Sequence, residues 1–360
     1  MKMRRIFTFE LQRVFCSKAL FGFLCLCLVL TFVFGNIFSH QYQIEQLKGN
    51  AEPSPTVDPA FFETYDAMEI YRVLAAARDG SGRPLSALAL RLLEQKYFFL
   101  DTKIPQLQAD SSASDLCFGA DTAGIFNDIF NRYSVVLLTL CSAFAALCVF
   151  TALGEDRVSR LQELVCAARF GRKTQAAGVL AAVVYTSAVY MILFAVGYFF
   201  MFLKNDFTGI WQQSIASLCN SCVTFDAIGP FVPYGSMTVL QYFAASLAVG
   251  YLVVLSFLLF AASAACLNRS AFSTVGLFFG VQIGILALLV GKTPGVSSFF
   301  FYVLRMTGVG LLYERGLWFS EGGHFTLVPY AETVYALVGI VAASLCFFLA
   351  HFFFKKRVNI

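Results

Sequence analysis

The sequence predicts an all-α protein that crosses a membrane six times and carries a helical domain between its first and second spans. Two observations predict this class. Hydrophobic residues make up 58% of the 360 residues and charged residues 13%. Apolar runs of about 20 residues, the length that a helix needs to cross a bilayer, also recur along the chain. The strands of a membrane β-barrel would instead alternate apolar and polar residues in runs of about ten.

Net charge and cysteine content exclude several classes of protein. The formal net charge is +4, but the basic residues concentrate beside the apolar runs, a pattern typical of membrane topology and not of nucleic-acid binding. Of the eleven cysteines, those within apolar runs are expected to be small core hydrophobes. Cys117, Cys219 and Cys222 fall in segments predicted to lie outside, where their spacing leaves a disulfide open. Because there is no second cysteine pair and no nearby histidine, neither a metal nor a cofactor is expected.

The N-terminus is predicted to lie on the membrane surface. Residues 1–18 are basic and place apolar side chains at i, i+4, i+7 and i+8, as in an amphipathic helix at the cytoplasmic interface. That helix leads into a first span over residues 19–38. A signal peptide is the alternative, but it would have a shorter basic region and a small-residue cleavage site, and neither occurs here.

The long polar stretch 39–132 is predicted to be an extracellular helical domain. Two segments in it have helical patterns, Phe61–Arg78 and Pro84–Leu100, and a glycine-containing turn separates them. Ser, Asp and Ala dominate Gln106–Ala123, which is expected to be a loop. Acidic residues outnumber basic ones across the stretch, which suits an exterior location.

A five-helix transmembrane region is predicted over 133–354, with a cytoplasmic tail over 355–360. Between the fifth and sixth spans, 298–313 is apolar but contains Arg305 and two glycines. If this segment crossed the membrane, the basic tail would lie outside, so an exterior interfacial or re-entrant helix is expected. The five predicted spans are Tyr133–Leu153, Ala176–Leu203, Thr238–Leu267, Ala271–Val290 and Tyr335–Phe354.

Glycines repeat every four residues in the fifth span. Gly276, Gly280 and Gly284 would form a flat strip on one helix face, and small residues let transmembrane helices approach closely. Chance in an apolar span is the alternative. We expect close helix packing on this strip, at a subunit interface.

The connection between the second and third spans, 154–173, concentrates charge. Its excess of arginine indicates the cytoplasmic side of the membrane, and its apolar residues recur at helical spacing opposite charged ones. A short amphipathic helix under the bilayer is expected, which a soluble partner would bind; a solvated connector that only sets topology is the alternative. The residues expected to couple to that partner are Glu155, Arg157, Arg160, Leu161, Glu163, Leu164, Gly171 and Arg172.

This connection resembles that of the permease subunits of ABC-2 type transporters. The resemblance rests on a glutamate after the second span, two leucines at helical spacing and a Gly-Arg start of the third span. Many such permeases have a lysine two turns further on, where this chain has Gly178 and Val179. The resemblance implies a dimer of permease chains in the plasma membrane of a bacterial cell, with both termini cytoplasmic and a separate ATPase bound at the connection. The matching residues are Glu155, Leu161, Leu164, Gly171 and Arg172.

The predicted spans lack the residues that ion-coupled carriers and intramembrane hydrolases use. No Asp, Glu, Lys or Arg lies in the interior of a predicted span, so neither ion coupling nor hydrolysis is expected. The Gly291-Lys292-Thr293 triplet is no phosphate-binding loop, because Leu286 stands where that motif needs a glycine. The chain is therefore expected to be an export subunit without enzymatic activity of its own. A non-transporting membrane scaffold or sensor is the alternative, and the substrate stays open among lipids, peptides and drugs.

Overall fold

Helices make up the regular structure of this protein. Strand pairing in the described part of the chain is limited to two isolated bridges, Ser214–Thr238 and Pro233–Ser320. The predicted all-α class is therefore confirmed. The computed structural model describes residues 2–39, 65–76, 85–112, 122–158, 171–205, 207, 209–216, 218, 231–268, 270–290 and 298–358.

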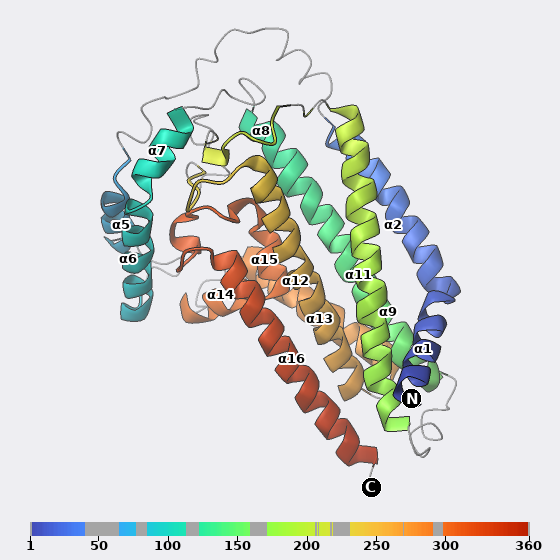
Figure 1. Cartoon of the computed structure of the whole chain (residues 1–360). Coiled ribbons are helices and arrows are strands. Elements are labelled where there is room, and N and C mark those ends of the chain that lie inside the picture. The colour runs from blue at the N-terminus through green and yellow to red at the C-terminus, as the bar shows by residue number, and fades with distance from the viewer. Residues whose placement is uncertain are drawn as a thin grey trace.

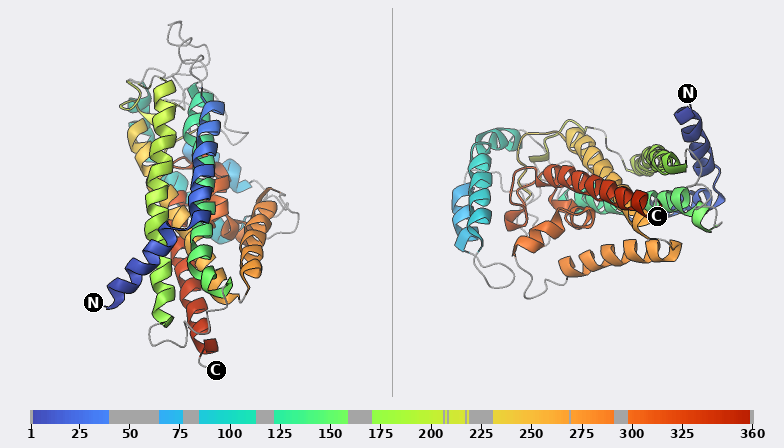
Figure 2. Two further views of the ribbon diagram at one scale, coloured as in Figure 1. Left: turned by 90° about the vertical axis from the view of Figure 1, so that its right-hand side faces the viewer. Right: turned by 90° about the horizontal axis from the view of Figure 1, so that it is seen from below.

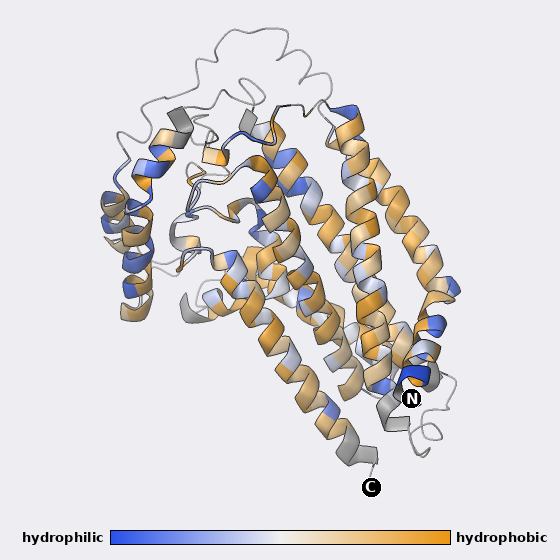
Figure 3. Ribbon diagram, viewed as in Figure 1, coloured by the Kyte–Doolittle hydropathy of each residue, from blue (hydrophilic) through white to orange (hydrophobic). Residues whose placement is uncertain are grey.

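Six helices among the described residues are long and apolar enough to cross a membrane. Each crossing segment has 19 to 31 residues, whereas the bilayer core needs about 20. Figure 3 shows these helices as predominantly hydrophobic ribbons. The protein is a multi-pass membrane protein, as predicted. The crossing segments lie on α2 (Lys18–Ile37), α9 (Tyr133–Val158), α11 (Gly171–Lys204), α12 (Val239–Leu267), α13 (Ala271–Val290) and α16 (Ala331–Val358).

The two ends of the chain lie at the same end of the helix bundle (Figure 1). We call this end the terminal end and the opposite one the far end. Two chain ends on one side are what an even number of spans requires. The N-terminal helix α1 (Lys2–Phe15) turns away from the axis of α2 (Figure 2), as an amphipathic helix that lies along a membrane surface does.

α9 lies at the centre of the bundle and packs against α2, α11 and α12, while α12 also packs against α16. Two glycines let these helices approach closely. A Cβ atom on Gly197 of α11 would lie 2.8 Å from the Tyr133 hydroxyl, and one on Gly250 of α12 would lie 2.7 Å from the Leu138 side chain. The Tyr133 hydroxyl also donates a hydrogen bond of 3.0 Å to the carbonyl of Thr31 on α2.

α13 flanks the bundle, and its glycine strip faces away from the rest of the described chain. The helix stands to one side of the other spans when the molecule is seen from below (Figure 2). A Cβ atom on Gly276, Gly280 or Gly284 would meet nothing within 4 Å. The strip is therefore not used for packing within the described part of this chain, and a partner for it would come from elsewhere.

The second span begins earlier than its predicted start at Tyr133. α8 (Thr122–Phe126) and the π-helical segment η2 (Asn127–Arg132) run directly into α9, so that the apolar segment covers Gly124–Gly154. The Asp128 carboxylate and the Arg132 guanidinium pair at 2.8 Å, one helical turn apart. This pairing reduces the cost of placing two charges at the end of a span.

A smaller helical layer lies beside the far half of the bundle (Figure 1). It consists of α5 (Ala67–Ala76), α6 (Ala87–Asp101) and α7 (Ile104–Ser112). α5 packs against α6, as the two predicted helices of this region should. The predicted loop was wrong over residues 106–112, because these residues belong to α7, which starts at Ile104. Pro105 lies in the first turn of this helix, where no amide donor is needed.

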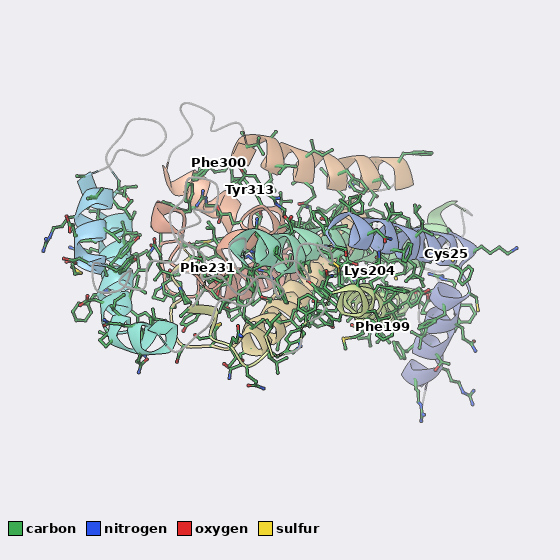
Figure 4. All side chains as sticks on the ribbon, turned by 90° about the horizontal axis from the view of Figure 1, so that it is seen from above. Cys25, Phe199, Lys204, Phe231, Phe300 and Tyr313 are labelled. Atoms are coloured by element: carbon green, nitrogen blue, oxygen red, sulfur yellow. The ribbon has the colours of Figure 1, made fainter. Side chains whose placement is uncertain are left out.

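Two short helices, α14 (Ser298–Arg305) and α15 (Gly308–Tyr313), precede the last span. Neither is long enough to cross a bilayer, so this segment is not a span, as predicted. Gly310 makes the tight turn between them feasible, because a Cβ atom there would lie 2.5 Å from the carbonyl oxygen of Leu304. Seen from the far end, Phe300 and Tyr313 lie on the side of the bundle that α13 flanks (Figure 4).

The described cysteines are all free thiols. Cys27, Cys141, Cys148 and Cys266 are buried in the bundle, as predicted for small core hydrophobes. Cys25 on α2 is exposed instead (Figure 4), and so is Cys346 on α16; both lie on helix faces that the bundle does not cover. The cysteines predicted to be outside, Cys117, Cys219 and Cys222, fall outside the described residues.

Candidate functional site

The terminal end joins α1 to the helices that flank the 154–173 connection. α1 packs on α9 and α11. The Arg13 guanidinium donates a hydrogen bond to the carbonyl of Ala152 in α9, and it also pairs with Glu10 at 3.0 Å. The Phe15 and Tyr185 rings lie 4.2 Å apart, which ties α1 to α11. α1 is therefore fixed to the helix ends between which the charged connection runs.

The predicted coupling residues divide between helix ends and the undescribed part of the connection. Glu155 and Arg157 belong to the last turn of α9, which ends at Val158. Gly171 and Arg172 are the first two residues of α11. The structure thus brings both ends of the connection to the terminal end of the bundle. Arg160, Leu161, Glu163 and Leu164, with the short helix predicted for them, lie outside the described residues.

At the far end, the π-helical segment η2 places a cluster of polar side chains at the start of the second span. A π-helical turn inserts one residue into the helix and often occurs at functional sites. Here it carries Asn127, Asn131 and Arg132 on the same side, and all three line one cavity. The side-chain amide of Asn131 donates to the Asn127 side-chain oxygen at 3.1 Å.

Arg315 lies at the centre of this polar cluster. It is 2% exposed. Its Nη1 donates hydrogen bonds to the Asn131 side-chain oxygen at 3.1 Å and to the Tyr242 hydroxyl at 3.0 Å. Its Nη2 donates to the carbonyl of Phe130 at 3.1 Å. The guanidinium also lies 4.5 Å from the Trp318 ring centroid. Arg315 therefore connects η2, α12 and the segment after α15 through neutral acceptors.

Arg305 and Glu314 form a second buried charged group beside the first. The Arg305 Nε lies 2.9 Å from a Glu314 carboxylate oxygen, and the two side chains are 2% and 9% exposed. The guanidinium is stacked between the Phe301 and Phe325 rings, 4.3 Å from each centroid, and Nη1 donates to the Phe325 carbonyl at 2.6 Å. Burial raises the pKa of Glu314 to about 7 although Arg305 acts in the opposite direction.

Lys96 attaches the small helical layer to the segment before the last span. Its Nζ donates to the carbonyls of Glu321, Gly323 and Thr326 at 2.7, 2.5 and 3.1 Å. The Glu321 carboxylate lies 3.8 Å away and accepts a hydrogen bond from the Tyr97 hydroxyl. Burial lowers the pKa of Lys96 to about 8, so the ammonium stays protonated at neutral pH.

The chain around these acceptors is folded so that its carbonyls converge on Lys96. Gly322 and Gly323 have φ values of +56° and +57°, in the left-handed region that glycine adopts without strain. Thr326 closes the loop, because its hydroxyl donates to the Glu321 carbonyl at 2.7 Å. The Glu321 amide in turn donates to the carbonyl of Val232 at 2.8 Å. The loop is thus a preformed set of acceptors for one ammonium group.

A cavity of about 370 Å³ lies between η2, α13, α14 and α15. Four charged residues line it, Arg132, Arg305, Glu314 and Arg315. Its apolar wall includes Val135 of α9, Leu289 of α13 and Leu312 of α15, with Tyr313 at the α13 side (Figure 4). The cavity therefore combines buried positive charge with an apolar side, and within the described residues no group of His, Cys, Asp or Glu is placed to hold a metal.

The sequence did not single out most of these residues. It identified Arg305 only as a charge that argues against a seventh span, and it gave Lys96, Asn131 and Arg315 no role. One signal was available: Glu314 and Arg315 interrupt a long apolar region, and buried charges are retained only when they are paired or used. What the sequence could not show is which neutral groups surround each charge, because those groups come from distant parts of the chain.

Comparison with known proteins identifies no family. No family model matches the chain, and no curated protein matches it. Its helices place it among multi-pass helical membrane proteins, with six candidate spans in the described part of the chain.

Proposed function

We propose that this chain is the membrane-spanning subunit of an ABC-2 type exporter, powered by a separate ATPase that binds at the 154–173 connection. One observation carries the proposal: α1 and the two helix ends that border the connection lie together at the terminal end, joined by Arg13 and Ala152. An interfacial helix beside a charged connection offers a soluble partner one continuous surface. The resemblance of the connection to that of ABC-2 permeases points to an ATPase as the partner.

The packing of the bundle gives this surface a mechanical connection to the spans. α1 contacts α9 and α11, α11 contacts α2, and α9 contacts α12. Interiors packed at this density transmit displacement because they compress little. A force applied to α1 and the connection would therefore move the α2–α9–α11 group against α12 and α16.

The proposal assigns the following roles. The ATPase binds the connection, and the chain itself supplies no nucleotide site. The residues of the connection that contact the ATPase are Glu155, Arg157, Arg160, Leu161, Glu163, Leu164, Gly171 and Arg172. Two such chains form the transporter in the plasma membrane, with both termini in the cytoplasm. Gly276, Gly280 and Gly284 are the surface for the second chain. Their open environment within one chain supports this assignment.

Charge reversal in the connection tests the proposal. Glu155→Arg and Arg160→Glu are each expected to reduce association with the ATPase subunit, because removing one partner of a buried charge pair at an interface costs about 2–5 kcal/mol. Association is measured by co-purification and by stimulation of ATP hydrolysis. Arg91→Glu, on the exposed side of α6, is the control that changes charge away from the terminal end.

Membrane insertion of all three variants is checked in parallel, since the basic residues at both chain ends still specify orientation. If both connection variants insert and bind the ATPase like the unchanged protein, the connection only sets topology. The transport proposal then loses its support, and the alternative of a membrane scaffold or sensor is favoured.

A further inference from the structure

We propose that the cavity between η2, α13, α14 and α15 binds an oxyanion of the phosphate or carboxylate class. This inference concerns the far end of the molecule and does not depend on an ATPase at the terminal end. Three features of the cavity carry it: the balance of charge on its wall, the unsatisfied state of Arg315, and the apolar side next to α13.

The charge balance favours an anion. Arg132, Arg305 and Arg315 line the cavity together with one carboxylate, that of Glu314. Counting +1 for each arginine and −1 for Glu314 leaves two positive charges on the wall, and Asp128, which pairs with Arg132, reduces this excess to one. Arg132 is the accessible one, with a side chain 57% exposed and paired to Asp128, whereas Arg305 and Arg315 are buried. Charges held away from water act on a ligand more strongly than charges on an open surface.

Arg315 has capacity left for a ligand. Its hydrogen bonds go to an amide oxygen, a hydroxyl and a carbonyl, and none of its described neighbours forms an ion pair with it. Among the described residues, no hydrogen-bond partner reaches its buried Nε. Since arginine stays protonated in proteins, a buried guanidinium whose hydrogen-bond acceptors are all neutral is costly. The buried Glu332 carboxylate attracts Arg315 electrostatically but forms neither a hydrogen bond nor an ion pair with it, so it reduces that cost only in part. An oxyanion at the guanidinium would offset that cost, and the planar fork of arginine suits carboxylate and phosphate.

The apolar side of the cavity distinguishes two sources of the oxyanion. Leu289 of α13 and Leu312 of α15 line the wall next to the outer helix, and Phe300 and Tyr313 lie on that side (Figure 4). The headgroup of an amphiphile would place its charge at the arginines and its chain along this wall. A free phosphate ion would use the arginines only. The headgroup and the free ion would both present the same kind of oxyanion to Arg315.

Trp318 provides a reporter for the test. Its ring lies against the Arg315 guanidinium, and the other tryptophan of the chain, Trp211, lies among aromatic rings of η2, α11 and α12. The full chain carrying Trp211→Phe, purified in dodecyl maltoside, therefore reports on Trp318 emission. The titrants are dodecyl phosphate and inorganic phosphate, and the controls are sodium chloride at equal ionic strength and additional dodecyl maltoside.

A saturable change in Trp318 emission with dodecyl phosphate, inorganic phosphate or both is expected. A response to dodecyl phosphate only identifies a headgroup, and a response to both identifies a free oxyanion. Arg132→Gln, at an accessible position, should weaken the apparent affinity at least about threefold. Arg91→Gln on α6 is the matched control and should leave it unchanged. Arg315→Gln should abolish saturation where the variant still elutes as a folded species.

Two results would overturn the proposal. One is the absence of a saturable response to either phosphate probe in the reporter chain. The other is an Arg132→Gln variant that binds as tightly as Arg91→Gln, because the cavity charge would then have no part in the response. Arg132→Gln decides the matter even if Arg315→Gln fails to fold.

Discussion

At the scale of single residues, the far end holds three buried cations in three different environments. Lys96 has carbonyl oxygens as its main acceptors, Arg305 has a carboxylate and two rings, and Arg315 has neutral side chains and one carbonyl. Removing each cation leaves different buried groups without their partner. The loss of Lys96 leaves carbonyl oxygens, the loss of Arg305 leaves a carboxylate, and the loss of Arg315 leaves neutral acceptors. The three sites should therefore respond differently to substitution.

Replacing Lys96 by methionine should be strongly destabilising. The three carbonyls and the Glu321 carboxylate would lose their shared donor inside the protein, and breaking a buried charged pair in this way costs about 3–5 kcal/mol. We expect a lower midpoint of thermal unfolding in detergent. Arg91→Met on the same helix, where the side chain is exposed, is the control. Equal stability of the two variants would show that the Lys96 contacts do not hold the layer in place.

Glu314 should make stability depend on pH. Its pKa rises from an ordinary value of 4.5 to about 7 on folding, so the folded state binds the proton more tightly than the unfolded state does. The resulting stabilisation is complete below pH 4.5 and is lost as the pH rises through about 7, on the order of 3 kcal/mol. The titratable groups acting on Glu314 are Arg305 from α14 and Tyr335 from α16.

We therefore expect the unfolding temperature of the unchanged protein to fall between pH 5 and 8 by more than that of Glu314→Gln. Glu94→Gln, which removes an exposed carboxylate on α6, should keep the slope of the unchanged protein. Parallel slopes for all three proteins would mean that the Glu314 carboxyl titrates alike in the folded and unfolded states.

At the scale of helices, hydropathy predicts where the spans are but not how they end. α13 has the same bounds as its prediction, Ala271–Val290, because an apolar helix between polar links has only one way to satisfy its backbone in lipid. The start of the second span was predicted late. There, Asp128 and Arg132 neutralise each other inside the helix, and no hydropathy pattern shows that two charges will pair.

The turn between α14 and α15 offers a test at this scale. Gly310→Ala should destabilise the protein, because the added methyl group would meet the backbone of Leu304 and Arg305 at 2.5–2.7 Å, and overpacking typically costs about 1–3 kcal/mol. Gly276→Ala is the matched change on a helix with nothing within 4 Å. Thermal unfolding of the two variants should differ clearly, with Gly276→Ala close to the unchanged protein. Equal midpoints would contradict the tight turn.

At the scale of the whole molecule, the glycine strip separates folding from assembly. In the described part of the chain nothing covers Gly280, so Gly280→Leu should leave the stability of a single chain almost unchanged. If a second chain packs on this strip, the same substitution should reduce the dimer fraction in native membranes. Cross-linking before extraction measures that fraction. Finding only monomers for the unchanged protein would count against the dimer.

Topology is the second prediction at this scale. Reporter fusions after Lys48 and at Phe300 should lie outside the cell, whereas those at Val165 and Val358 should lie inside. The reason is the basic charge at both chain ends and in the connection. A reporter at Val358 that is active only outside would reverse the proposed orientation and remove the surface on which an ATPase would bind.

The Lys96 contacts also bear on how the protein is made. Lys96 and Glu321 are 225 positions apart, so the acceptors of the ammonium leave the ribosome roughly 10–45 seconds after Lys96 at ordinary rates of translation. During that interval the nascent α6 lacks the loop that will hold it. A chain truncated before residue 321 should therefore expose this layer to protease, whereas the completed chain protects it. The contacts of Lys96 at the far end are thus complete only once residues 321–326 have been made.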